Sequence, residues 1–341
     1  AISGMVASLG DPYTVFLPPA ENQTAKSDLR GDFEGVGIQI DYKQTADSQN
    51  DSDKDKKLVV VAPLAGTPAE RAGIKAGDVI LRIVDEARKI DKSTQGISLP
   101  EAVDLIRGPK GSVVRLTIQR EGVEKPFEVA LKRETIVVKS VELKFQENNG
   151  KAVAVLKLSR FGERTEAEWK EAVASIKGQE AKNKNFAGII LDLRNNPGGL
   201  LQGSVFIASE FLARGIVVQQ DKGVDGKEVY EVDRHGLLLK EPLVVLVNGG
   251  SASASEIVAG ALQETGRARL VGEKTFGKGT VQEAEDLPGG AGLHVTVAAW
   301  LLPSGKSIDK QGVKPDIEIK NEEKDLSKDA QLQKAIELLT S

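Results

Sequence analysis

Residues Pro242-Leu-Val-Val-Leu-Val-Asn-Gly-Gly-Ser-Ala-Ser253-Ala-Ser-Glu256-Ile257 carry the strongest folding signal in this chain. The apolar run 242–247 is short and continuous, which is typical of a strand buried on both faces. Glu256 follows Ser253 by three residues and precedes further apolar residues, so this spacing predicts a helix that starts at Ser253. A turn from a buried strand into a helix would expose the Ser253 hydroxyl above a sheet, beside free backbone N–H groups.

A second stretch, Gly272-Glu-Lys-Thr-Phe-Gly-Lys278-Gly-Thr-Val-Gln282, places a lysine between two glycines. The chain has only two histidines, so few residues could serve as the base of a serine-histidine-aspartate triad. A neutral lysine can instead accept the proton of a serine, provided that burial brings its pKa toward ~7–8. Ser253 and Lys278 together suggest a hydrolase. The alternative interpretation is that Ser253 only caps a helix.

These residues belong to a wider resemblance, because nearly the whole chain resembles the carboxy-terminal processing proteases, also called tail-specific proteases. Further matching segments are Leu9-Gly-Asp-Pro-Tyr-Thr, Gly66-Thr-Pro-Ala-Glu-Arg-Ala-Gly-Ile-Lys-Ala-Gly-Asp-Val-Ile and Asp192-Leu-Arg-Asn-Asn-Pro-Gly-Gly-Leu-Leu. The resemblance implies that Ser253 is the nucleophile, that Lys278 is the base and that the Gln282 carbonyl orients Lys278. It also implies an oxyanion hole made by the N–H groups of Ala254 and of either Gly198 or Gly199.

Residues 33–122 are expected to form a separable unit. Two further Ser/Thr-x-x-Glu patterns, starting at Thr67 and Ser98, predict short helices between short apolar strands. The unit resembles a PDZ domain, in which a peptide adds as a strand to a sheet edge and a glycine-rich loop binds its terminal carboxylate. We expect an apolar C-terminal residue to bind there. The expected contacts are Gly35, Val36, Gly37 and Ile38 in the loop, and Val103, Ile106 and Arg107 on the second helix.

The expected fold is multidomain α+β, with a small β-rich PDZ domain inserted between an N-terminal helical segment and an α/β crotonase-like serine protease core. The expected boundaries are 1–32 for the N-terminal helical segment, 33–122 for the PDZ domain, 123–322 for the core and 323–341 for a C-terminal helix. Apolar stripes in 1–17 and 329–339 indicate terminal helices. Two interpretations stay open for them: dimerisation, as in relatives, or packing onto the chain's own core.

Composition narrows the function. The 46 basic and 50 acidic residues are interspersed and give a net charge of −4, which argues against nucleic-acid binding. The chain has no cysteine, so no disulfide can form, and with two histidines a zinc site is not expected. The segment ending in Gly277-Lys278 looks like a phosphate-binding loop, but Gly279 stands where that motif requires Ser or Thr. We therefore expect no cofactor.

No apolar run reaches transmembrane length, and the chain begins with Ala1 rather than Met. The resemblance implies a signal or anchor segment ahead of Ala1, and hence a cell-envelope, periplasmic or secreted protein.

We expect a serine endopeptidase that recognises protein substrates with apolar C-termini. An activator or adaptor protein is a further expected partner, because the PDZ domain gates activity in several relatives, and Arg107 is the candidate contact. Two alternatives are a catalytically inert peptide-binding scaffold and an enzyme that acts on acyl-coenzyme A, as other proteins with a crotonase-like core do.

Overall fold

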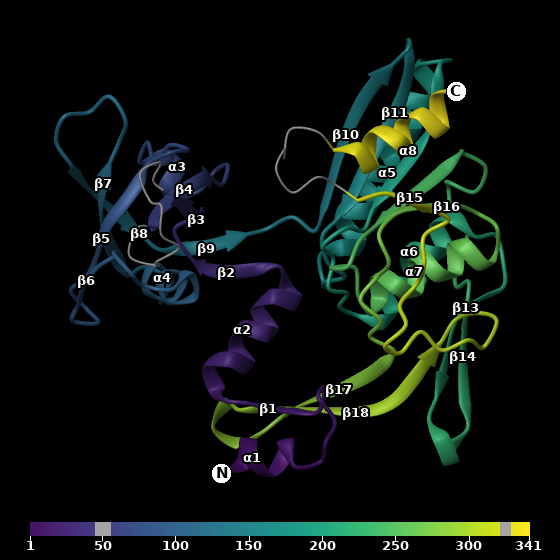
Figure 1. Cartoon of the computed structure of the whole chain (residues 1–341), viewed down its shortest axis with the longest axis horizontal. Helices are drawn as coiled ribbons and strands as arrows, with labels where there is room; N and C mark the ends of the chain where they lie inside the picture. Colours follow the sequence, from purple (N-terminus) through teal and green to yellow (C-terminus); the bar gives the residue numbers. More distant parts are fainter. Residues whose placement is uncertain (45–55, 321–328) are drawn as a thin grey trace. The chain divides into compact units, whose positions relative to one another are not determined.

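The computed structural model describes residues 1–44, 56–320 and 329–341, drawn in colour in Figure 1. The chain forms two compact units, and each has a hydrophobic core of its own. The core unit combines Ala1–Gly31 with Lys139–Ser341, and the inserted unit is Asp32–Val138. We expected the inserted unit at 33–122, but strand β8 (Phe127–Lys132) pairs along β7 (Val113–Gln119), which extends the unit to Val138.

The inserted unit is a small antiparallel sheet with two helices. Its strand order is β3-β4-β5-β7-β8, and β6 pairs with β5. The first and last strands of the unit in the sequence, β2 and β9, form a separate antiparallel pair. The remaining elements are β2 (Asp32–Gly35), β3 (Ile38–Gln44), β4 (Lys56–Pro63), α3 (Pro68–Arg71), β5 (Val79–Asp85), β6 (Ile90–Ser93), α4 (Leu99–Ile106) and β9 (Glu134–Val137).

Both helices of the inserted unit begin where the sequence predicted, but only one has a side-chain cap. The Ser98 hydroxyl accepts a hydrogen bond from the Glu101 N–H and so caps α4. The Thr67 hydroxyl donates to the carbonyl of Leu64 at 2.6 Å and accepts no hydrogen bond from the first N–H groups of α3. The Glu70 carboxylate accepts from the Gly66 N–H instead, at 2.7 Å.

The central sheet of the core unit has the order β10-β11-β12-β15-β16-β19. All neighbouring strands are parallel except the pair β10-β11. Helices lie on both faces, which explains why β15 is an unbroken apolar run with every residue buried. The elements are β10 (Val141–Asn148), β11 (Lys151–Leu158), α5 (Thr165–Lys182), β12 (Phe186–Asp192), α6 (Leu201–Phe211), β15 (Leu243–Val247), α7 (Ala254–Glu264), β16 (Arg269–Gly272), β19 (Ile317–Glu318) and α8 (Ala330–Thr340). The expected multidomain fold, with a small β-rich unit inserted into a chain with an α/β core, is confirmed.

Three neighbouring parallel strands position the candidate site. The carboxyl ends of β12, β15 and β16 lie at the same edge of the sheet, where binding sites of parallel sheets form. The Pro197-Gly-Gly turn follows β12, Ser253 follows β15, and the loop with Lys278 follows β16. Segments that are far apart in the sequence therefore meet at one place.

A second sheet lies beside this edge in the core unit. Its long strand β18 pairs with β1, β13 and β17, and β14 pairs with β13 (Figure 1). The elements are α1 (Ile2–Ala7), β1 (Val15–Leu17), α2 (Pro19–Arg30), β13 (Ile216–Asp221), η2 (Gly223–Asp225), β14 (Lys227–Glu231), β17 (Thr280–Asp286), η3 (Pro288–Gly290) and β18 (Gly292–Leu301).

The N-terminal segment differs from the expected helix over 1–17. Helix α1 ends at Ala7, and the chain then forms a turn in which the Asp11 carboxylate accepts from the Tyr13 N–H and the Thr14 hydroxyl. This local side-chain bonding competes with helix formation and leads the chain into β1.

The C-terminal helix α8 packs onto the chain's own sheet. Its buried Ala335 and its partly buried Leu332 and Ile336 lie on the face formed by strand residues such as Ile190 and Leu246. The core-packing interpretation therefore applies to α8, while 321–328 lie outside the described residues.

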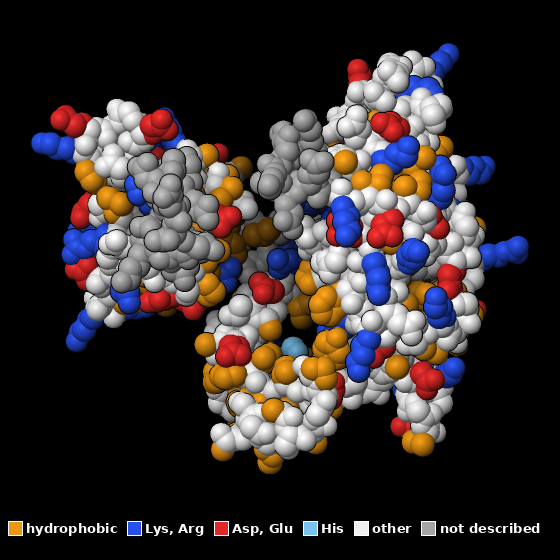
Figure 2. Space-filling view, viewed as in Figure 1, with side chains coloured by type: hydrophobic (Ala, Val, Ile, Leu, Met, Phe, Trp, Pro, Cys, Tyr) orange, Lys and Arg blue, Asp and Glu red, His pale blue; other side chains and the backbone are white. Residues whose placement is uncertain are grey.

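Apolar side chains also gather on the surface over α1, α2 and the β17–β18 hairpin (Figure 2). Among the described residues, no helix combines the length and apolarity that a membrane span requires.

Candidate active site

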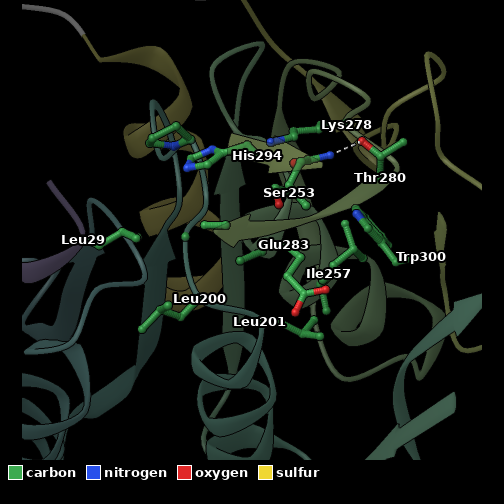
Figure 3. A pocket seen from close by; sticks show the side chains of 16 residues that line it. Leu29, Leu200, Leu201, Ser253, Ile257, Lys278, Thr280, Glu283, His294 and Trp300 are labelled. Carbon is green, nitrogen blue, oxygen red and sulfur yellow. Dashed lines mark hydrogen bonds between the residues drawn. The ribbon is translucent and has the colours of Figure 1, made fainter. Parts of the chain in front are cut away.

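Only one of the three neighbouring serines is available for chemistry. Ser251 and Ser255 are fully buried, and their hydroxyls donate to the carbonyls of Leu193 and Asn196 at 2.8 Å each. Ser253 is half-buried and lines a cavity of about 480 Å³, where Figure 3 labels it. The structure thus leaves the Ser253 hydroxyl accessible from the cavity, while the hydroxyls of Ser251 and Ser255 are buried and bonded to the backbone.

The backbone at Ser253 is strained. Its φ of 55° and ψ of −117° lie in a region that a residue with a Cβ rarely adopts. Such a conformation costs about 1–3 kcal/mol and persists only where the surroundings enforce it. Here the Ser253 N–H donates to the Glu256 carboxylate at 2.8 Å, and Ser253 stands directly before α7. The strain is consistent with a hydroxyl that is held out over the sheet edge.

Lys278 lines the same cavity. Its flanking glycines allow a second chain segment to approach, since a Cβ on Gly279 would lie 2.6 Å from Asp309 and one on Gly277 would lie 2.9 Å from the Gly312 nitrogen. Burial lowers the pKa of Lys278 below its ordinary value. A lysine in this position loses its proton more readily than one in water, as a general base must.

Glu256 connects the serine and lysine segments. Its carboxylate is fully buried and accepts from the N–H groups of Ser253, Gly277 and Lys278, and from the Thr275 hydroxyl at 2.5 Å. Burial raises the pKa of Glu256, and these four hydrogen bonds oppose that rise. The sequence pattern assigned Glu256 only a helix-capping role. It was not expected to contact the lysine loop, because that contact depends on strand order.

The N–H groups of the three oxyanion-hole candidates, Gly198, Gly199 and Ala254, differ in whether they already have an acceptor. The Gly198 N–H donates to the Asn196 side-chain oxygen at 2.9 Å and is therefore occupied. Within the described residues, the N–H groups of Gly199 and Ala254 have no hydrogen-bond acceptor, and both residues line the cavity. Gly198 instead allows close packing, because a Cβ there would lie 2.8 Å from the Ser253 Cβ.

Asn196 holds the Pro197-Gly-Gly turn against the serine turn. Asn196 is fully buried. Its side-chain amide donates to the Leu158 carbonyl at 2.8 Å, and its backbone carbonyl accepts from the Ala252 N–H at 3.0 Å. Sequence analysis missed this role, although Asn196 lies inside the segment that carried the family resemblance.

Gln282 lines the cavity, but its side chain hydrogen-bonds to two threonines rather than to Lys278. Its amide donates to the Thr280 hydroxyl at 2.8 Å, drawn as the dashed line in Figure 3, and to the Thr296 hydroxyl at 3.4 Å. Among the described residues, no hydrogen bond joins Lys278 Nζ to either Gln282 or Ser253 Oγ. Hydrogen bonds between catalytic groups are often long before substrate binds, so this geometry leaves the dyad hypothesis standing.

The cavity wall is largely apolar. Its other lining side chains include Leu29, Leu200, Leu201, Ile257, Val281, Ala284 and Trp300, together with His294 and Glu283 (Figure 3). Burial and the nearby Lys278 lower the pKa of His294, which favours the neutral imidazole. No cluster of three or more metal-ligating side chains occurs among residues 1–44, 56–320 and 329–341. The cavity is suited to an apolar side chain of a peptide rather than to a charged ligand.

The inserted unit has a separate groove of about 200 Å³. Its lining residues are Phe33, Val36, Gly37, Ile38, Gln39, Ile40, Val103, Ile106 and Arg107. The carbonyls of Val36 and Gly37 accept from Ala69 and Leu64. In a trans peptide bond, the C=O of one residue and the N–H of the next residue point in opposite directions. The N–H groups of Gly37 and Ile38 therefore point away from Ala69 and Leu64.

The edge of this groove is open to an added strand, because β3 stands at the end of the sheet order. The Arg107 guanidinium lies 4.5 Å from the centre of the Phe33 ring, and both side chains line the groove. Gly35 does not line the groove, and a Cβ there would lie 3.0 Å from the same ring.

The core unit and the inserted unit together have the architecture of a PDZ-containing peptidase. Comparisons with known proteins agree. The family model for peptidase family S41 matches residues 152–319, and a PDZ domain model matches residues 59–120. The carboxy-terminal processing protease CtpA of Bacillus subtilis is 38% identical over 318 residues, which make up 93% of this chain and 62% of that protein. The chain thus spans less than two thirds of the length of that relative.

Two further relatives are similar over the whole chain. The carboxyl-terminal-processing protease of a Picosynechococcus strain is 39% identical over 100% of this chain and 78% of that protein. The solved photosystem II D1 C-terminal processing protease is 32% identical, with a TM-score of 0.57, and covers 100% of this chain and 85% of that chain. The chain belongs to the carboxy-terminal processing proteases of peptidase family S41.

Proposed function

We propose that this chain is a serine endopeptidase that uses Ser253 and Lys278 as a catalytic dyad and binds apolar C-terminal tails through its inserted unit. The observation that carries the proposal is one cavity that contains the only accessible hydroxyl of Ser251, Ser253 and Ser255, a partly buried lysine and two free N–H groups. Membership of the processing-protease family supports the same activity.

In the proposed mechanism, Ser253 Oγ attacks the carbonyl carbon of the scissile peptide bond while Lys278 Nζ takes the hydroxyl proton. The N–H groups of Gly199 and Ala254 donate to the oxyanion of the tetrahedral intermediate. Lys278 then returns the proton to the leaving amine, and the C–N bond breaks to leave an ester on Ser253. A water molecule, deprotonated by Lys278, hydrolyses this ester and restores both residues.

The proton transfer requires a neutral Lys278, and its burial supports that state. Gln282 acts by orienting the amine once Lys278 has turned toward Ser253. Its side chain already lines the cavity, and it can exchange its present bonds to Thr280 and Thr296 for one to the lysine.

The inserted unit binds the substrate tail. The terminal carboxylate binds to the N–H groups of Gly37 and Ile38, the peptide adds to the edge of β3, and Val103 and Ile106 contact its last side chain. Arg107 contacts the peptide or an activator at the end of this groove. Replacing Arg107 with alanine should weaken both peptide affinity and cleavage, and unchanged values in both assays would remove Arg107 from the proposal.

The resemblance places this activity in the cell envelope, the periplasm or the extracellular space. Fractionation of cells that express the natural gene, followed by detection of the protein in each fraction, tests that location. Recovery in the cytoplasm alone would contradict it.

The decisive experiment follows cleavage of an unfolded protein with an apolar C-terminus by mass spectrometry. Wild type and Ser251→Ala should both cleave it, because the buried Ser251 hydroxyl bonds to the Asn248 N–H and the Leu193 carbonyl and does not line the cavity, whereas Ser253→Ala and Lys278→Ala should not. Equal cleavage by all four proteins would point to another site. Binding without cleavage by wild type would favour the inert scaffold, and specific binding of coenzyme A would favour acyl-coenzyme A chemistry.

A further inference from the structure

The N-terminal segment reaches the catalytic cavity. Strand β1 pairs with β18, with Val15 opposite the cavity residue His294. Just before β1, the Thr14 hydroxyl accepts from the Thr296 N–H at 3.1 Å and donates to the Asp11 carboxylate at 2.6 Å. These bonds fix the backbone on both sides of Tyr13. The side chain of Tyr13 is therefore held in a defined place rather than being part of a loose terminus.

The Tyr13 ring lies against the candidate base. Lys278 Nζ is 5.4 Å from the centre of that ring, and in the described part of the chain this amine makes no hydrogen bond. We propose that Tyr13 is a positioning residue for Lys278, because its ring closes one side of the space around the amine, limits its rotamers and keeps water from it. This inference rests on the proposed serine–lysine mechanism.

Two effects of the ring on Lys278 oppose each other. Attraction between an ammonium group and a ring face favours the charged lysine, but the 5.4 Å separation is near the outer limit of about 6 Å for this attraction. Loss of water contact favours the neutral amine. Burial is also the cause of the lowered Lys278 pKa. The ring therefore favours the neutral base.

Tyr13 is not itself a second base. Burial raises the pKa of its hydroxyl above 10.0, and the charges of Asp309, Glu256 and Asp11 raise it further, so Tyr13 stays neutral in the working pH range. The other titratable groups around the lysine are Glu256, which accepts from the Lys278 N–H, and the cavity residues Glu283 and His294, of which His294 has a lowered pKa. Tyr13 thus acts as an uncharged wall beside Lys278.

The test measures kcat/KM against pH between 6 and 10, with the unfolded protein substrate described above. Tyr13→Ala should admit water, raise the pKa of Lys278 and move the acid limb of the profile to higher pH by about one unit. At a pH below the acid limb, kcat/KM of Tyr13→Ala should be about tenfold lower than that of wild type. A pKa that is higher by one unit leaves ten times less neutral Lys278 at the same pH. Tyr13→Phe keeps the ring and should retain the wild-type profile.

Phe16→Ala is the matched control, since it removes an aromatic ring from β1 that does not contact Lys278. It should leave the acid limb in place even if stability falls. An unshifted acid limb in Tyr13→Ala would overturn the inference, and so would a Tyr13→Phe profile that follows the alanine variant. If Tyr13→Ala does not fold, Tyr13→Leu should give an intermediate shift, and no shift would contradict the inference. Cleavage that survives in Lys278→Ala would instead refute the serine–lysine mechanism on which this inference rests.

Discussion

Lys278 illustrates at the residue scale how the chemistry of this site conflicts with folding. Its ammonium group loses hydration in the cavity, which lowers its pKa. The same desolvation that suits a general base destabilises the folded chain while the lysine is charged. Residues at functional sites commonly reduce stability in this way, and the positive φ of Ser253 is a second example.

Replacing Lys278 with methionine should therefore stabilise the protein near neutral pH, by about 0.5–2 kcal/mol, while abolishing cleavage. The pKa of Lys278 in the folded chain lies below its ordinary value of 10.5, so the folded chain loses this proton first as pH rises. Stability of the wild type should rise across that window, and the advantage of the variant should shrink. Chemical denaturation of both proteins at pH 7 and pH 10 measures the difference. An advantage that grows with pH would contradict the sign.

Glu256 couples two elements, since one carboxylate accepts from the start of α7 and from the loop before β17. Glutamine at this position has one acceptor oxygen for the four donors. Its NH₂ group would face some of these donors instead of accepting from them. We expect the free energy of unfolding to fall by about 1–3 kcal/mol and cleavage to fall with it. Glu264→Gln is the control at the exposed far end of the same helix. Its carboxylate accepts only from the Ser304 N–H and hydroxyl in the described part of the chain, so this change should affect stability by less than about 0.5 kcal/mol. Equal thermal shifts for the two variants would argue against the coupling.

The turn after β12 depends on Asn196 in a similar way. Asn196→Ala removes the acceptor of the Gly198 N–H and the donor to the Leu158 carbonyl, so the turn that presents Gly199 should loosen. Loss of one oxyanion donor typically lowers kcat by about 10²–10³. We expect a fall of that order with a smaller change in KM, measured by steady-state kinetics on a peptide substrate. A variant with raised KM and unchanged kcat would show that this turn serves substrate binding instead.

At the scale of the whole molecule, the two units contain separate cores and should unfold as two cooperative transitions. A peptide with an apolar C-terminus should stabilise only the inserted unit, by about 2.7 kcal/mol at one hundred times its Kd. Differential scanning calorimetry with and without peptide tests this. Val103→Lys places a charge in the groove and should abolish the peptide-induced shift while leaving both transitions visible. A peptide that moves both transitions equally would contradict binding at the inserted unit alone.

Local patterns were sufficient for much of this protein. The apolar run before Asn248 predicted β15, the Ser-x-x-Glu spacing predicted the start of α7, and the resemblance identified the family and proposed Ser253 and Lys278. These signals span a few residues, so they can be recognised without knowing what packs against them. Other features depend on contacts between distant segments. Strand order brings Glu256 to the lysine loop, hydrogen bonding to Asn196 occupies Gly198 and leaves Gly199 free, and pairing with β18 brings Tyr13 to Lys278. Burial and hydrogen-bond partners are properties of the assembled fold, because they arise only when segments far apart in the chain pack together.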